Sequence, residues 1–146
     1  MPFMVKISME KGAEDLFPAK ARPGDAAWDL RSRVDAELPV GRSVAVPTGV
    51  RMELPENFEA QVRPRSGLAL KHDLMLTNSP GTIDSGYRGE VAVIMYNAGV
   101  APYRIRRGDR IAQMVICRLP EVVLEQSDEL SESDRGTGGF GSTGKN

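Results

Sequence analysis

The sequence predicts an all-β protein built around one core. Short apolar or alternating runs recur along the chain, and Gly, Pro, Asn and Asp separate them. No stretch of ten or more residues has the apolar spacing of an amphipathic helix. The chain has 146 residues, 40% of them hydrophobic, which suits one globular domain. A β-sandwich, a jelly roll or a compact barrel fits these observations.

Eight strands are expected, and the segment FEAQVR at 58–63 has the strongest signal. Its apolar and polar residues alternate, which is the period of a half-buried strand. The other expected strands are 5–7, 43–46, 50–54, 74–77, 90–96, 103–105 and 110–117. Turn residues between these runs predict turns at 47–49, 97–99 and 107–109.

The segment PRSGLALK, residues 64–71, predicts the one short helix of the chain, from Ser66 to Lys71. Ser66 is a candidate N-cap. Free N–H groups at a helix start attract phosphate, and the Arg65 guanidinium and the Ser66 hydroxyl could add contacts. The alternative is an ordinary capped helix beside a solvated arginine.

The segment GTIDSGYRGEV, residues 81–91, predicts a hairpin turn with Gly86 and Gly89 for backbone freedom. The turn could serve structure alone, with Asp84 forming a local Asx-turn. It could also present Asp84 and Tyr87 to a ligand.

Two further polar residues stand among apolar neighbours. Gln113 lies in the middle of the expected strand 110–117 and needs a backbone or ligand partner, unless it faces solvent. Asp29 follows Trp28, the only tryptophan. Its carboxylate could hold Mg²⁺ directly or through water, or it could be a surface residue beside a core tryptophan.

The last twenty residues, SDELSESDRGTGGFGSTGKN, have the composition of a disordered tail. Residues 139–145 resemble a phosphate-binding P-loop, but Asn146 stands where that motif needs Ser or Thr, and no helix follows. We therefore reject a P-loop. A glycine-rich arm remains, with Arg135, Ser142 and Thr143 as possible phosphate ligands and Phe140 as a stacking surface.

Composition narrows the function classes. The formal net charge of -1 gives no general attraction to nucleic acid or to anionic membranes. A single cysteine, Cys117, cannot form a disulfide within one chain and favours a reducing compartment. The N-terminal segment lacks the apolar stretch of a signal peptide, and no run approaches a membrane span. We expect a cytoplasmic protein, with Cys117 in the core and His72 outside any site.

Five motifs in a fixed order carry a resemblance to a known family. The segments DAAWDLRS, PRSGLALK, GTIDSGYRGEV, RGDRIAQMVI and RGTGGFGSTG resemble the ordered motifs of the trimeric deoxyuridine triphosphate nucleotidohydrolases, the dUTPases. The resemblance extends from about residue 20 to residue 144. One departure is that Ala27 and Trp28 replace the usual glycine and the residue after it.

The resemblance implies a jelly-roll-like β-barrel of the β-clip type, residues 1–126, and a flexible C-terminal arm, residues 127–146. It implies a homotrimer in which three chains share each active site. The activity would be hydrolysis of dUTP to dUMP and pyrophosphate with Mg²⁺, which limits uracil in DNA and supplies dUMP for thymidylate synthesis. No nucleic acid or membrane partner is expected.

The same resemblance implies a role for each motif residue. Asp84 would be the general base that activates water, and Tyr87 would exclude a 2′-hydroxyl. Asp29 would contact Mg²⁺ through water. Substrate-binding residues would be Arg65, Ser66, Gly67, Asn78, Thr82, Ile83, Tyr87, Gln113, Arg135, Phe140, Gly141, Ser142 and Thr143. Phe140 would lie over the uracil ring.

Two other readings stay open. A dCTP deaminase shares the fold, but it would need a glutamate as acid and base at the pyrimidine, and the segment from Asp84 to Gly89 argues against it. A catalytically silent nucleotide-binding module is also possible, because a fold does not fix a function.

Overall fold

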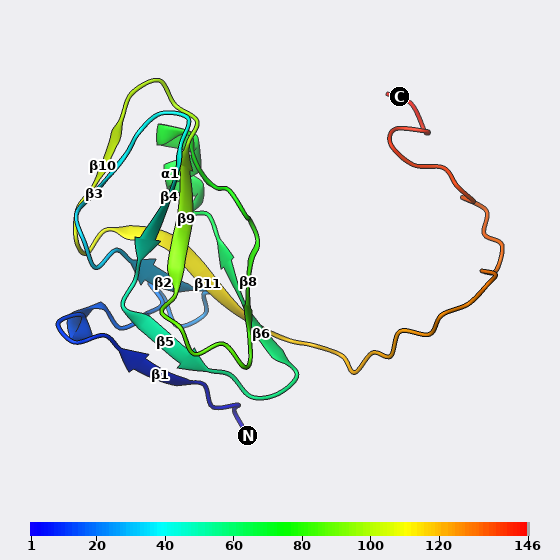
Figure 1. The fold of residues 1–146 in the computed structure, drawn as a ribbon, viewed down its shortest axis with the longest axis horizontal. Helices are drawn as coiled ribbons and strands as arrows, with labels where there is room; N and C mark the ends of the chain where they lie inside the picture. Colours follow the sequence, from blue (N-terminus) through cyan, green and yellow to red (C-terminus); the bar gives the residue numbers. More distant parts are fainter. Residues whose placement is uncertain (146) are drawn as a thin grey trace.

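The computed structural model describes residues 1–145, which form a β-barrel with one short α-helix (Figure 1). A single 3-10 helix, η1, spans Glu14–Leu16, and α1 spans Ser66–His72. The strands of the described chain are β1 (Lys6–Met9), β2 (Trp28–Arg31), β3 (Ala36–Leu38), β4 (Ser43–Pro47), β5 (Val50–Glu53), β6 (Phe58–Arg63), β7 (Leu74–Leu76), β8 (Gly81–Asp84), β9 (Ala92–Asn97), β10 (Tyr103–Ile105) and β11 (Arg110–Arg118).

Antiparallel pairing arranges these strands in one four-stranded sheet, one three-stranded sheet and two ribbons. The four-stranded sheet has the order β2-β11-β6-β8, and the three-stranded sheet has the order β4-β9-β7. The ribbons are β1-β5 and β10-β3. Leu30, Ala60 and Met114 of the first sheet and Val46 and Val93 of the second belong to one buried cluster, so the two sheets face each other. The all-β, jelly-roll-like prediction is confirmed.

The alternation in β6 sets which side chains reach the core. Phe58, Ala60 and Val62 are buried, whereas Glu59 and Arg63 face outward. β6 lies between β11 and β8, so its outward residues are flanked on both sides by outward residues of its neighbours. This outer face carries several of the polar residues that the sequence singled out.

Three strands, β2, β3 and β8, were not predicted. β3 has only three residues, and β8 begins with glycine and ends with aspartate, which are depleted in strands. The strand expected over 90–96 begins two residues later, at Ala92. Pairing across the sheets, rather than local propensity, defines these elements.

The expected hairpin over residues 81–91 is wrong. β8 pairs with β6, whereas β9 pairs with β4 and β7 in the other sheet. The connection from residue 85 to residue 91 is therefore a corner between two sheets. Inside it, the Tyr87 amide donates to the Asp84 carbonyl at 3.1 Å. We call residues 85–89 the sheet corner.

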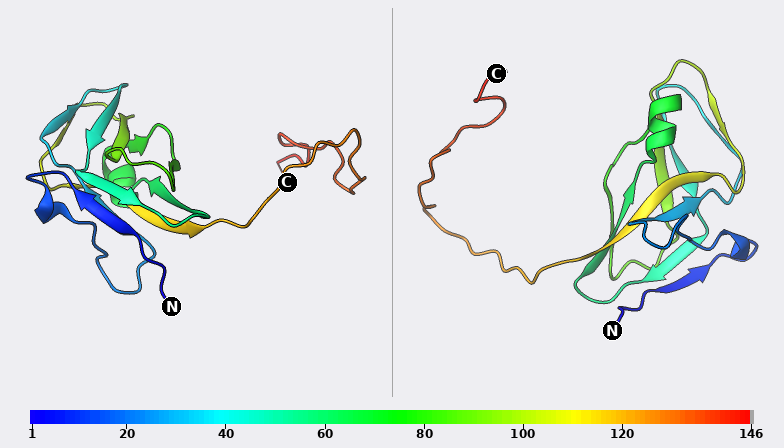
Figure 2. Two further views of the ribbon diagram at one scale, coloured as in Figure 1. Left: turned by 60° about the horizontal axis from the view of Figure 1, so that its bottom comes forward. Right: turned by 180° about the vertical axis from the view of Figure 1, so that it is seen from behind.

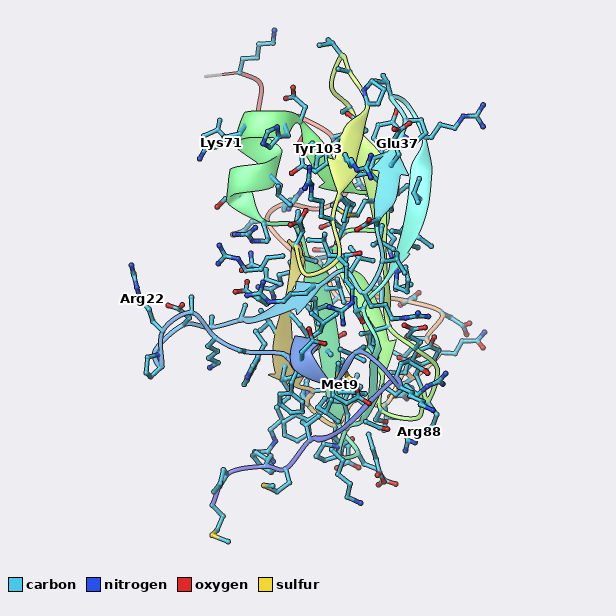
Figure 3. The ribbon with its side chains drawn as sticks, turned by 90° about the vertical axis from the view of Figure 1, so that its left-hand side faces the viewer. Met9, Arg22, Glu37, Lys71, Arg88 and Tyr103 are labelled. Carbon is cyan, nitrogen blue, oxygen red and sulfur yellow. The ribbon has the colours of Figure 1, made fainter. Side chains whose placement is uncertain are left out.

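The predicted helix is present, but its N-cap is Arg65 instead of Ser66, and no side chain caps it. Its first N–H groups thus have no side-chain acceptor. Lys71 on α1 and Arg88 in the sheet corner lie at opposite ends of the barrel (Figure 3).

After β11 the chain leaves the barrel. Residues 119–145 extend away from the sheets in every view (Figure 2). Hydrogen bonds of Ser133, Arg135 and Ser142 join residues of this segment to one another. Asn146, the last residue of the expected arm, lies outside the described residues. None of the helices within residues 1–145 has the length and apolar character that crossing a membrane requires.

Candidate active site

A cleft of about 170 Å³ lies beside β8, and we call it the β8 cleft. β8 is an edge strand of its sheet, so half of its backbone N–H and C=O groups have no strand partner. The residues that line the cleft are Val62, Asn78, Gly81, Thr82, Ile83, Asp84, Tyr87, Glu90, Val91, Ala92 and Ile94. The structure thus brings the predicted residues Asn78, Thr82, Ile83, Asp84 and Tyr87 together.

Asp84 ends β8 with its side chain exposed on the outer face of the sheet. Within residues 1–145 its carboxylate has no hydrogen-bond or ion-pair partner, whereas Glu59, opposite it on β6, accepts from the Gln61 amide at 2.7 Å. A free carboxylate is ionised at neutral pH and can accept a proton or a hydrogen bond. Of these two carboxylates, Asp84 is the one available to a water or a ligand.

Tyr87 stands at the cleft with a fixed ring. Its hydroxyl donates to the Glu90 carbonyl at 3.0 Å. The ring also packs on Gly89, because a Cβ added there would overlap the phenol oxygen and Cζ. With 46% of its surface exposed, the tyrosine keeps a large face for a ligand. Gly89 is therefore needed for close packing as well as for backbone freedom.

A second cleft, of about 380 Å³, lies on the same sheet, and we call it the Gln113 cleft. Ala21, Asp25, Ala26, Ala27, Asp29, Arg63, Gln113 and Val115 line it. The register places Gln113 beside Asp29 on β2 and beside Arg63 on β6. Gln113 donates to the Pro64 carbonyl at 2.9 Å, which leaves its amide oxygen open to the cleft's solvent or to a ligand donor.

Cations surround this second cleft. Arg65 donates to the Arg110 carbonyl at 3.0 Å, which holds its guanidinium next to β11. Arg110 lies 3.6 Å from the Asp29 carboxylate, and Arg63 lines the cleft. Ser66 and Gly67 follow Arg65 as exposed residues at the start of α1. Three arginines and uncapped amides form an environment for a polyanion.

The two clefts lie apart in one chain. Asp84 is opposite Glu59 at one end of β6, and Gln113 is opposite Arg63 at the other. That separation is about 13 Å along the strand, on opposite sides of β6. The arm residues Arg135, Phe140, Gly141, Ser142 and Thr143 lie farther away, on the extended segment (Figure 2). One chain alone does not bring all the predicted residues together.

Sequence reasoning missed Arg63, Arg110 and Glu90. The alternation in β6 could have indicated Arg63, because it sits on the outward face two residues before Arg65. Glu90 lines the β8 cleft, and a hydrogen bond from Arg33 holds the pKa of its carboxyl below the ordinary value. No sequence signal connects Arg33 with a residue 57 positions away.

Mg²⁺ fits this chain only as an ion shared with a ligand. Within residues 1–145 no three His, Cys, Asp or Glu side chains are grouped to hold a metal. Mg²⁺ is commonly bound by one or two carboxylates together with substrate phosphates. Asp29, at the edge of a cleft rich in arginine, supplies one such carboxylate.

A jelly-roll barrel with an edge-strand cleft and an arginine-rich cleft defines a protein of the nucleotide-binding class. The family model described as dUTPase matches residues 14–144. The chain therefore belongs to the dUTPase family.

Named relatives cover nearly the whole chain. A deoxyuridine 5′-triphosphate nucleotidohydrolase of Clostridium acetobutylicum is 54% identical over 142 residues, which is 97% of this chain and 98% of that protein. Its counterpart in Gloeothece citriformis is 51% identical over 136 residues, which is 93% of this chain and 92% of that protein.

Solved structures agree on the fold. The dUTPase of Staphylococcus bacteriophage 80alpha, solved with dUPNHPP, superposes with a TM-score of 0.89 at 26% identity, over 97% of this chain and 99% of that one. The dUTPase of phage phi11, which coordinates a structural Mg(II) ion, superposes with a TM-score of 0.79 over 86% of this chain and 97% of that one. At 22% identity the second likeness concerns the fold alone.

Proposed function

We propose that this chain hydrolyses dUTP to dUMP and pyrophosphate, as the names of its relatives describe for them. The observation that carries the proposal is the β8 cleft, where Asp84 and Tyr87 meet at the free edge of a strand. The activity would limit uracil incorporation into DNA and supply dUMP for thymidylate synthesis. The half-buried free thiol of Cys117 supports a cytoplasmic location.

The free edge of β8 supports binding of the uracil base. A pyrimidine presents alternating donors and acceptors, and an edge strand presents the complementary backbone groups. Thr82 and Ile83 supply such backbone groups, and the Asn78 side chain lies beside Gly81, with its amide nitrogen 3.1 Å from where a Cβ would stand. Cytosine exchanges the donor and acceptor at its 4-position, so backbone groups fixed for uracil would reject it.

Tyr87 supports selection of the sugar. Its ring is held over Gly89 and its hydroxyl is tied to the Glu90 carbonyl, so the ring cannot yield easily. A deoxyribose can pack on this ring, whereas the additional hydroxyl of ribose would need space that the ring occupies. The proposed substrate is therefore the deoxynucleotide.

Asp84 is the proposed general base. It would accept a proton from the attacking water while the water oxygen bonds to the α-phosphorus. The bond from that phosphorus to the bridging oxygen breaks, and pyrophosphate leaves with the electron pair. A positioned carboxylate contributes about 10²–10⁴-fold to such a step. Its lack of another partner in the described chain leaves it free for that water.

The phosphate chain would lie at the Gln113 cleft. Arg65, Ser66, Gly67 and Gln113 would hold its oxygens with charged and neutral donors. Asp29 would contact Mg²⁺ through water. When bound, Mg²⁺ supplies charge neutralisation for the phosphates. Positioning and electrostatics account for most of the rate in phosphoryl chemistry.

The separation of the two clefts supports a site shared between chains. The Asp84 end of one chain would meet the Gln113 cleft of another in a homotrimer. Residues 127–146 would act as an arm of a third chain on the barrel of residues 1–126. Arg135, Gly141, Ser142 and Thr143 would reach the terminal phosphate, and Phe140 would cover the base. Such closure would exclude bulk water.

Pyrophosphate release from dUTP, UTP, dTTP and dCTP tests this function. The expected result is rapid release from dUTP in the presence of Mg²⁺ and slow release from the other three. Ammonia release from dCTP would favour the deaminase instead. Binding of dUTP without any release would identify a silent nucleotide-binding module.

A further inference from the structure

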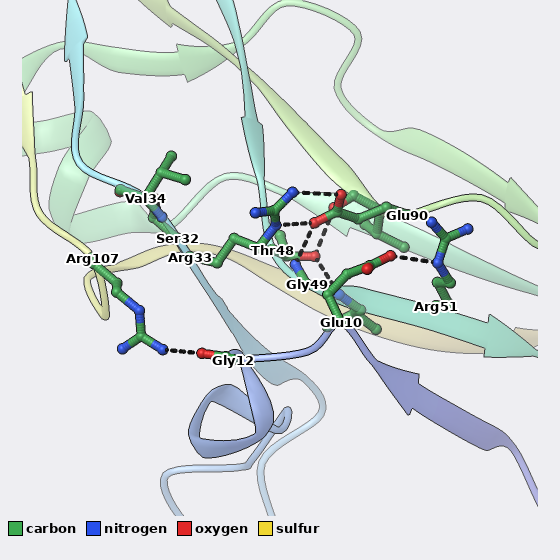
Figure 4. A network of polar contacts seen from close by, with 12 residues as sticks. Glu10, Gly12, Ser32, Arg33, Val34, Thr48, Gly49, Arg51, Glu90 and Arg107 are labelled. Carbon is green, nitrogen blue, oxygen red and sulfur yellow. Dashed lines mark hydrogen bonds and ion pairs between the residues drawn. The ribbon is translucent and has the colours of Figure 1, made fainter.

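An ion pair lies beneath the sheet corner, on elements outside the predicted motifs. Arg33 follows β2, and Glu90 precedes β9. The guanidinium donates twice to the carboxylate, from Nε at 2.5 Å and from a terminal nitrogen at 3.1 Å (Figure 4). The Glu90 side chain is 19% exposed, against 37% for Arg33. A forked pair of this kind fixes orientation as well as distance.

The same carboxylate is fastened to the turn between β4 and β5. The Gly49 amide donates to Glu90 at 2.8 Å. Gly49 has a φ of +76°, and a Cβ there would lie 2.6 Å from the Ala13 Cβ. Next to it, the Thr48 hydroxyl donates to the Val91 carbonyl at 2.6 Å. The end of the sheet corner is thus bound to a turn that has no room to shift.

A second arginine holds the corner one turn earlier. Arg51 donates to the Arg88 carbonyl at 3.0 Å and to the Glu10 carboxylate at 2.6 Å. Figure 4 shows the two arginines on either side of Gly49. Gly86 and Gly89 leave the corner backbone free to adopt many conformations. The outside contacts therefore select one of them.

This network connects directly to the selectivity tyrosine. The Glu90 carbonyl accepts the Tyr87 hydroxyl, while the Glu90 side chain is held by Arg33. Arg33 itself does not line the β8 cleft. A movement of Glu90 would shift the acceptor of the Tyr87 hydroxyl and the strand end that carries Asp84.

We propose that Arg33 and Glu90 are positioning residues that set the choice of sugar by holding the Tyr87 ring. The proposal rests on the dUTP hydrolysis proposed above. Glu90 acts through its backbone carbonyl and Arg33 acts through Glu90, so neither is a catalytic residue. The hydrogen bond from Arg33 lowers the pKa of the Glu90 carboxyl, which keeps the pair charged at neutral pH.

The experiment compares kcat/KM for dUTP and for UTP in Arg33→Met, Glu90→Gln and the double variant. Methionine keeps an apolar stem and removes the donors. We expect the ratio of dUTP to UTP to fall about 10- to 100-fold in each single variant, because an ångström of misplacement has effects of that size. The double variant should lose no more than either single variant, since both break one unit. Arg33→Lys should restore part of the ratio.

Arg107→Met is the matched control. Arg107 forms an equally forked pair with Asp15, at 2.7 and 3.0 Å, and is 41% exposed. It lies away from the corner (Figure 4), so its loss should leave the ratio unchanged. If Arg33→Met and Glu90→Gln fold and keep the wild-type ratio, the positioning role is wrong. If the unmodified protein releases no pyrophosphate from dUTP, the proposed function itself fails.

Discussion

The phenol ring of Tyr87 packs directly on the backbone of Gly89, two residues along the chain. An added Cβ at Gly89 would overlap the ring, whereas an added Cβ at Gly86 would meet nothing within 4 Å. The two glycines of the sheet corner therefore have different roles. One permits the tyrosine to lie close to its own backbone, and the other is free of side-chain contacts.

The first prediction uses this difference. Gly89→Ala should push the Tyr87 ring off its seat and reduce the dUTP to UTP ratio of kcat/KM by about 10-fold or more. Gly86→Ala, the matched control, should leave the ratio within about twofold, because surface changes without contacts have small effects. Equal ratios in both variants would show that ring packing does not set selectivity.

The second prediction concerns the shared site. Asp84→Asn and Arg65→Met should each be inactive alone. When the two are unfolded and refolded together, a homotrimer with sites between chains should regain about a quarter of wild-type activity. This fraction arises because about three quarters of the trimers are mixed, and each mixed trimer has one intact site of three. A site built within one chain would regain none.

The third prediction concerns the arm. A chain that ends at Asp134 should lose most of its dUTP hydrolysis but keep the melting temperature of the barrel. The hydrogen bonds of Arg135 and Ser142 stay inside the arm, so the sheets lose no partner. Phe140→Ala should reproduce part of the loss. Full activity in the shortened chain would make the segment a passive tail.

The fourth prediction is an acid effect on stability. The folded pKa of Glu90 lies below its ordinary value of 4.5, chiefly through the hydrogen bond from Arg33. Its contribution is then complete above the unfolded pKa and is lost as the pH falls through the folded one. The stability difference between wild type and Glu90→Gln should shrink between about pH 6 and pH 3. A constant difference would contradict the ionic pair.

Much of the barrel could be predicted from local patterns. The alternation in β6 indicated both its strand and its buried face, and this is confirmed. β8 could not be found this way, because glycine and aspartate give no strand signal and its pairing with β6 is remote. The motif order indicated which residues belong to the site. It could not indicate Glu90 and Arg33, since a contact across 57 positions leaves no local pattern.

The most direct test of the account is the turnover of Asp84→Asn. Asparagine keeps the shape of the side chain but cannot accept the proton of the attacking water. Glu59→Gln, which changes the neighbouring carboxylate on the same face, is its control. We predict that Asp84→Asn releases pyrophosphate from dUTP at least ~100-fold more slowly while it binds a non-hydrolysable dUTP analogue as before. Wild-type turnover in Asp84→Asn would contradict the assignment of Asp84 as the base.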